Sequence, residues 1–200
     1  MNDSNSPRPI GASMSGSPAS SSKAEVASGQ YQQELDRCAL LCGLDERELL
    51  AFLERVRFEG FTPGDDVLTE GNRYHGVWIL LSGTCEVIKH GPHRDSRLAI
   101  LEPGSVFGEM SFLDAVPHAA TVRAVDRIET LRMMREQYED LRQSCPSAAH
   151  KIAVNMVRTL SDRLRRMDEW ICELVEKDGD GRRFEEWQDF RAKLYTDLFD

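Results

Sequence analysis

The chain has 200 residues, of which 40% are hydrophobic and 30% charged, and its formal net charge is −9 at pH 7. This length suits one domain of ordinary size with tails. The negative charge argues against a surface that grips nucleic acid throughout, because phosphate binding depends on clustered lysine and arginine. No apolar stretch is long enough to cross a membrane and no secretory signal opens the chain, so we expect a cytoplasmic protein.

The N-terminal part changes character near residue 30. Residues 1–30 are rich in Ser, Gly, Pro and Ala and carry no periodic apolar residues. Such a segment buries too little apolar surface to offset the entropy lost on ordering, so we expect a disordered tail. The apolar residues after Gln32 then predict a short helix that ends near Gly43. Asp45 followed by Glu48 has the spacing of a capping box and predicts the start of a second helix.

Short apolar runs separated by turn residues fill residues 57–134. Glycine and proline mark the turns, as in Pro63-Gly64-Asp65 and Pro103-Gly104. Strands that recur about every 8–12 residues with such turns between them are typical of a β-sandwich or barrel. A parallel α/β fold is disfavoured, because no crossover helix would fit between the strands.

A long helix is predicted to begin at Pro146, a residue that suits the first turn of a helix. At about 28 residues and 1.5 Å per residue it would extend about 42 Å and overhang a small barrel. We expect the helix of residues 147–176 to pair with that of a second copy; the alternative is that it continues across its own domain. Its apolar residues recur at spacings of three and four: Ile152, Met156, Leu160, Leu164, Met167, Ile171 and Leu174.

Residues 177–200 are predicted to form an acidic C-terminal helix. From Glu169 to Asp200 the chain has ten acidic and five basic residues, a surface that would repel DNA. Trp187 and Phe190 suggest an amphipathic helix, which we interpret as a docking or capping element.

The most informative segment is residues 103–124. The step Gly108-Glu109 opens a short helical turn between two strands, and a turn of this kind points several backbone amides in one direction. A carboxylate at its start can accept hydrogen bonds from a sugar hydroxyl. Pro117 would direct the chain back, so that His118 faces the same amides. These features predict a site for a small anionic ligand.

This segment resembles the phosphate-binding cassette of cyclic nucleotide-binding domains, a family that includes bacterial catabolite activator proteins, protein kinase A regulatory subunits and gated channels. Phe107-Gly108-Glu109 and the stretch from Pro117 to Val122 carry the match, with Glu109 and position 118 nine residues apart. The resemblance covers about residues 37–170. It implies a mainly β fold with flanking helices: a jelly-roll barrel (a double-stranded β-helix) followed by a long C-terminal dimerisation helix, together spanning residues 31–176.

The resemblance also implies a ligand, cyclic AMP or another cyclic nucleotide, and a set of residues that bind it. A cyclic dinucleotide is the alternative anionic ligand. The implied binding residues are Phe107, Gly108, Glu109, Met110, Ser111, Pro117, His118, Ala119 and Ala120.

One position departs from the family pattern. His118 stands where the family carries the arginine that pairs with the cyclic phosphate, and histidine is shorter and only partly protonated near neutral pH. The loss of a charge-assisted hydrogen bond, worth about 1.5–3 kcal/mol, would weaken binding roughly tenfold to more than a hundredfold. The competing interpretations are that His118 is a surface residue without an anion partner, and that Glu109 caps the amides of the turn.

On the long helix, the family's base-contacting residues would fall near Thr159, Arg163 and Leu164. Leu164 is apolar and Arg163 is bulky, which puts base recognition in question. Arg163, with Arg165 and Arg166, is most simply interpreted as a solvated helix face.

The sequence predicts a regulatory protein rather than an enzyme. We find no nucleophile–base pair and no phosphate loop, and we expect no metal and no cofactor beyond the ligand. The family's transcription factors carry a winged helix-turn-helix after the long helix, for which too few residues follow here, so we expect no direct contact with DNA. We expect a stand-alone sensor that signals through protein contacts. The alternatives are a ligand-independent interaction scaffold and a transcription regulator that acts through a separate DNA-binding partner.

Overall fold

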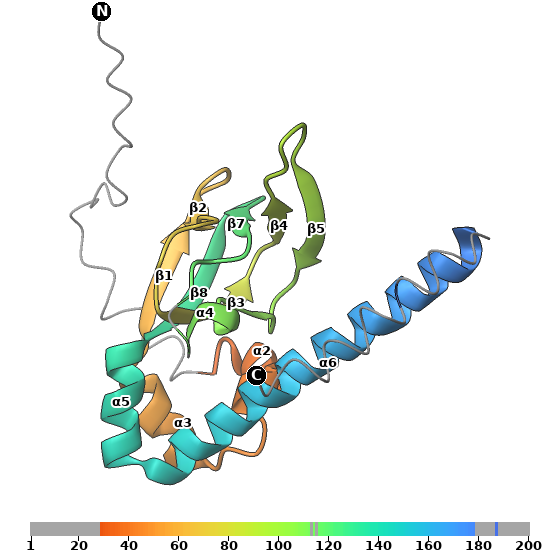
Figure 1. Ribbon diagram of the computed structural model, residues 1–200. Helices are drawn as coiled ribbons and strands as arrows, with labels where there is room; N and C mark the ends of the chain where they lie inside the picture. The colour runs from red at the N-terminus through yellow and green to blue at the C-terminus, as the bar shows by residue number, and fades with distance from the viewer. Residues whose placement is uncertain (1–28, 113, 115, 179–186, 188–200) are drawn as a thin grey trace, which may run out of the picture.

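The computed structural model describes residues 29–112, 114, 116–178 and 187. The predictions of a disordered tail at 1–30 and of an acidic helix at 177–200 fall almost wholly outside these residues. Figure 1 shows strands in two layers, helices packed below them and one long helix that leaves the body of the domain. The helices are α2 (Gln32–Arg37), the 3-10 helix η1 (Ala39–Leu41), α3 (Glu46–Leu53), α4 (Glu109–Phe112), α5 (Arg135–Ser144) and α6 (Pro146–Asp178).

Eight strands form two four-stranded antiparallel sheets. The orders are β1-β8-β3-β6 and β2-β7-β4-β5, so that strands distant in sequence lie next to each other. The predicted jelly-roll barrel followed by a long C-terminal helix is therefore confirmed. The strands are β1 (Arg57–Phe61), β2 (Asp66–Leu68), β3 (Gly76–Ser82), β4 (Cys85–Lys89), β5 (Ser96–Leu101), β6 (Val106–Phe107), β7 (Thr121–Ala124) and β8 (Ile128–Met134).

Strand β3 is apolar along almost its whole length because both of its faces are covered. Successive side chains of a strand point to opposite faces of the sheet. Trp78 and Leu80 pack in the cluster between the two sheets. Val77, Ile79 and Leu81 pack in a second cluster, which the helices share. β3 therefore separates the barrel core from the helical layer.

The predicted capping box at the start of α3 is confirmed. The Asp45 side chain accepts a hydrogen bond from the Glu48 amide at 2.9 Å, and the Glu48 carboxylate accepts one from the Asp45 amide at 2.9 Å. The helical segment before it differs from the prediction, because it is divided into α2 and η1 rather than forming one helix.

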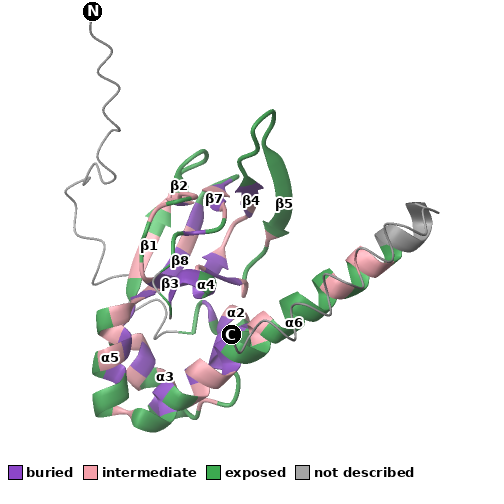
Figure 2. Ribbon diagram, in the orientation of Figure 1, coloured by how far each residue is buried: buried purple, intermediate pink, exposed green. Residues whose placement is uncertain are grey.

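Helix α6 begins at Pro146, as predicted, and has two parts with different surroundings. Ile152 and Met156 are buried against the domain. The first part of α6 therefore packs across its own domain. Leu164 and Met167 are more than half exposed where the helix extends past the barrel (Figure 2). Pairing with a second copy stays a prediction. None of the described helices combines the length and the apolar character that spanning a bilayer requires.

Candidate functional site

The predicted cassette is the connection that carries the chain from one sheet to the other. β6 belongs to the first sheet and β7 to the second, and residues 108–120 run between them and include the single turn of α4. Gly108 permits this path: its φ is +83°, and a Cβ there would approach the Gly76 carbonyl oxygen to 2.7 Å. A residue with a side chain would therefore be strained and would also clash.

Glu109, the first residue of α4, is buried with 2% of its surface exposed. Its Oε1 accepts a hydrogen bond from the Arg163 guanidinium, and the same guanidinium donates to the Val106 carbonyl at 2.6 Å. Oε2 is buried and has no hydrogen-bond partner among the described residues. The carboxylate accepts no bond from a described backbone amide, which contradicts the interpretation of Glu109 as a cap of its own turn.

His118 is buried as well, with 4% of its surface exposed, so its interpretation as a surface residue is wrong. Its Nδ1 and the Ser111 hydroxyl share a hydrogen bond of 2.6 Å, and its ring lies edge-on to Trp78, with the centroids 6.5 Å apart. Nε2 is buried and lacks a hydrogen-bond partner in the described part of the chain. Burial first, and then the nearby His75, holds the pKa of His118 below its ordinary value of 6.5. The neutral imidazole is the favoured form.

The expected binding residues divide into a buried and an accessible set. Phe107, Glu109, Ser111 and His118 are buried; Met110, Pro117 and Ala119 are exposed; Gly108 and Ala120 are intermediate. The buried aromatic side chains form one wall, since the rings of Trp78 and Phe107 stack with centroids 6.0 Å apart. At the other end of the cassette, the Ala119 carbonyl accepts a hydrogen bond of 2.8 Å from Lys89. The connection thus carries three buried polar residues, Glu109, Ser111 and His118, beside an aromatic wall that β3 and β6 supply.

Arg163 is exposed, as expected of a solvated helix face, but it also makes a contact that the sequence interpretation did not foresee. Arg165 and Arg166 are exposed as well. Arg163 reaches Glu109, 54 residues earlier in the chain. The position of Arg163 in the sequence could have predicted this contact. Arg163 lies seven residues after buried Met156, and residues seven apart share a helix face. An arginine on an apolar face indicates a buried partner.

The three positions expected to contact a base, Thr159, Arg163 and Leu164, have different surroundings. The Thr159 hydroxyl donates to the Asn155 carbonyl of its own helix at 2.9 Å. Leu164 is exposed. Of the three positions, Arg163 alone makes a hydrogen bond to the cassette within the described part of the chain.

Comparison with known proteins agrees with the fold. Residues 58–145 match the model of the family described as "Cyclic nucleotide-binding domain". A CRP-like cAMP-activated global transcriptional regulator of Mycobacterium tuberculosis is 26% identical over 149 residues, 74% of this chain and 65% of the regulator. The crystal structure of the Thermus thermophilus catabolite activator protein matches with a TM-score of 0.62 and 28% identity, over 68% of this chain and 63% of that chain.

Similar domains also occur within larger proteins of another class. Glutaminase 2 of Bradyrhizobium diazoefficiens is 32% identical over 127 residues, which are 63% of this chain but 20% of the glutaminase. The present chain spans 65% of the length of the mycobacterial regulator and 60% of that of a cyclic AMP receptor protein of Thermus thermophilus. The match to the family model and the jelly-roll fold agree: residues 58–145 of this chain are similar to the cyclic nucleotide-binding domain.

Proposed function

We propose that this chain is a regulatory sensor that binds a cyclic nucleotide at the cassette and signals in the cytoplasm through protein contacts. The observation that carries the proposal is the buried Glu109 carboxylate, one oxygen of which lacks a hydrogen-bond partner in the described chain. A buried acceptor left unpaired costs about 1–3 kcal/mol, and a sugar hydroxyl would satisfy it. The binding residues are Phe107, Gly108, Glu109, Met110, Ser111, Pro117, His118, Ala119 and Ala120.

The affinity for a cyclic mononucleotide is expected to be low. A neutral His118 offers no charge to the phosphate, whereas an arginine would offer a permanent charge and two parallel donors. Its Nδ1 is already bonded to Ser111, and only Nε2 is left without a partner among the described residues. His118 is therefore proposed to line the pocket rather than to anchor the phosphate.

The signal is proposed to pass through a homodimer formed by α6 and on to a protein partner, without direct contact to DNA. The formal net charge of −9 opposes association with a polyanion. The outer part of α6 presents apolar side chains that a second helix would cover. A ligand can shift such an assembly only if it binds one arrangement more tightly than the other.

A second candidate function is an interaction scaffold that no longer binds a ligand. It is favoured by the contact between Arg163 and Glu109, because the carboxylate proposed to meet the sugar already has a cation on one oxygen. The neutral, buried His118 favours it as well.

Isothermal titration calorimetry of the purified chain with cyclic AMP, cyclic GMP and cyclic di-GMP separates the two functions. The sensor requires saturable binding of at least one nucleotide. His118→Arg should tighten binding of a cyclic mononucleotide roughly tenfold or more, because it restores a charge-assisted hydrogen bond. His93→Arg, in the exposed β4–β5 loop, adds the same charge away from the cassette and should leave binding unchanged.

The thermal melting of each variant establishes that it is folded. Absence of binding by the wild-type chain and by a folded His118→Arg variant would reject the sensor and favour the scaffold. Tightening by His93→Arg to the same degree would show that net charge, rather than the cassette, governs the interaction.

A further inference from the structure

The cassette described above has a carboxylate but no cation of its own. Glu109 is buried, and the position expected to hold an arginine holds His118, which burial keeps in the neutral form. A cyclic phosphate bound here would meet the Glu109 carboxylate and no positive charge from the β6–β7 connection, which contains no lysine or arginine. Binding of an anion at such a place requires a cation from another element.

Arg163 of α6 is placed to be that cation. Its side chain is 45% exposed, and its guanidinium reaches both Glu109 and the carbonyl of Val106, the first residue of β6. A guanidinium has five N–H donors. Two of them make these bonds, which leaves three without a partner among the described residues. The planar fork of arginine matches a phosphate in geometry, so the free edge can receive one.

Two other cations bond to the cassette, and both already have a carboxylate partner. Arg135 donates to the Phe112 carbonyl at 3.3 Å and pairs with Glu139 at 3.4 Å. Lys89 of β4 lies 2.6 Å from the Glu70 carboxylate, and its ammonium also donates to the Ala119 carbonyl at 2.8 Å. Glu70 in turn accepts a hydrogen bond from the His90 amide at 2.9 Å, which fixes the carboxylate beside Lys89. Lys89 thus carries a carboxylate partner outside the pocket, whereas the partner of Arg163 is the cassette glutamate itself.

We propose that α6 supplies, through Arg163, the cation that the cassette lacks at position 118, so that an anionic nucleotide is held between the cassette and the long helix. The inference rests on the function proposed above and deepens it. Arg163 keeps Glu109 in place for the sugar and turns its free donors to the phosphate. Ligand affinity and the docking of α6 against β6 are then linked, and each strengthens the other by the same factor. The binding site itself thereby senses where α6 lies.

The test uses the full chain, cyclic AMP as the probe and calorimetry as the measurement. Arg163→Gln should weaken binding at least tenfold. Arg163→Lys keeps the charge but loses the planar fork of donors, so its affinity should lie between those of the wild type and Arg163→Gln. Arg165→Gln is the matched control, because Arg165 lies two residues away on the same helix and pairs with Asp162 on the surface. It should bind as the wild type does. Thermal melting shows whether each variant is folded.

The decisive variant is the double change Arg163→Gln with His118→Arg. If Arg163 acts as the pocket's cation, an arginine at position 118 should restore binding, whereas damage to the structure around α6 would not be repaired by it. If the wild type binds cyclic AMP and Arg163→Gln binds it equally well or more tightly, this inference alone is overturned. Arg163 would then block the site instead of binding the phosphate. Absence of binding by the wild type and by His118→Arg would overturn the proposed function, and this inference with it.

Discussion

The imidazole of His118 contributes to the electrostatic character of the cassette. His118 replaces a permanently charged side chain by one that titrates, and the fold then disfavours its charged form by burying it. The hydrogen bond with Ser111 holds the ring in the wall beside Trp78. At this one residue, the cassette has a packed aromatic ring in its neutral form and no permanent positive charge.

The lowered pKa of His118 makes stability depend on pH in a defined direction. Above pH 6.5 the residue is neutral in both the folded and the unfolded chain. Below pH 6.5 the unfolded chain binds the proton more readily, so the free energy of unfolding falls as the pH is lowered. His118→Gln should therefore lose less stability than the wild type between pH 7.5 and pH 5.5, measured by urea unfolding. His93→Gln, at an exposed position, should behave as the wild type does. Parallel curves for all three chains would contradict the assignment.

At the scale of elements, polar contacts fasten the first part of α6 to the helices that precede the barrel. Lys151 donates to the Glu48 carboxylate at 2.6 Å and to the Gly43 carbonyl at 2.8 Å. Asn155, one turn later, donates to the carbonyls of Leu40 at 3.0 Å and Cys42 at 2.8 Å. These bonds satisfy chain ends of η1 and the turn after it, and they set the direction in which α6 leaves the domain.

The contact between α3 and α6 should fail in acid. The hydrogen bond from Lys151, followed by that from the Asp45 amide, lowers the pKa of Glu48 from 4.5 to about 2. Its contribution to stability is therefore complete above pH 4.5 and is lost as the pH falls toward 2. Glu48→Gln should destabilise the chain in denaturant unfolding at pH 7 but far less at pH 3. Glu46→Gln, exposed on the same helix, serves as the control. An equal loss at both pH values would mean that packing, rather than charge, is removed.

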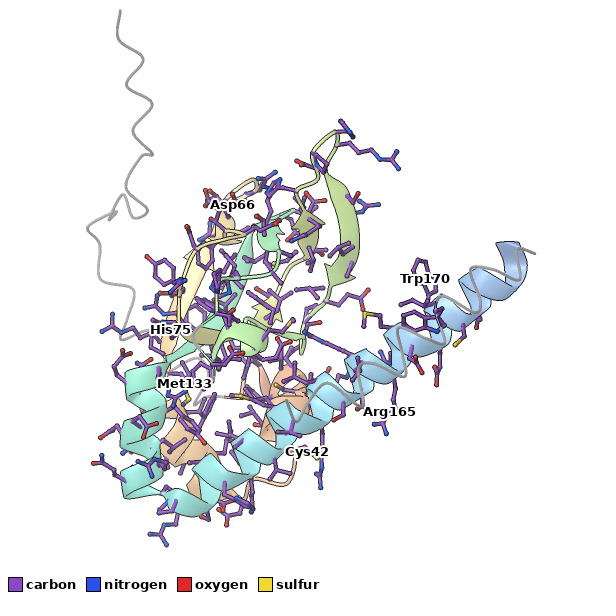
Figure 3. The ribbon with its side chains drawn as sticks, in the orientation of Figure 1. Cys42, Asp66, His75, Met133, Arg165 and Trp170 are labelled. Atoms are coloured by element: carbon purple, nitrogen blue, oxygen red, sulfur yellow. The ribbon has the colours of Figure 1, made fainter. Side chains whose placement is uncertain are left out.

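At the scale of the whole molecule, the outer part of α6 is an apolar surface without a cover in the described chain. Leu164, Met167 and Trp170 are each more than half exposed. Figure 3 shows Trp170 and Arg165 projecting from different sides of this helix. A helix with one apolar side that extends past its domain gains stability by pairing with another.

Sedimentation analysis tests the pairing directly. The wild-type protein is expected to sediment as a dimer, in which α6 of one copy packs against α6 of the other. Leu164→Glu together with Met167→Glu should produce monomers, because burying four carboxylates in the interface, two from each copy, is costly. Arg165→Glu changes the charge on the solvated side and should remain dimeric. A monomeric wild type, or a dimer that persists after the double change, would show that α6 does not form the dimer interface.

Local pattern determined much of this protein. Spacing of apolar runs and turn residues identified the barrel, Pro146 marked the start of α6, and Asp45 with Glu48 marked α3. The order of residues in the segment from Phe107 to Val122 placed the cassette. These features depend on neighbours in the chain, because strand and helix periodicity and capping act over a few residues.

Only the tertiary structure decided which groups meet in the site. It buried His118, left one oxygen of Glu109 without a described partner, and brought Arg163 to that glutamate across 54 residues of chain. The path of α6 across the domain decides that last contact, and that path follows from packing against η1, α3 and α5 rather than from residues adjacent to Arg163. Burial and pairing at a distance are properties of the packed whole, so the charge of the pocket could not be determined from the cassette alone.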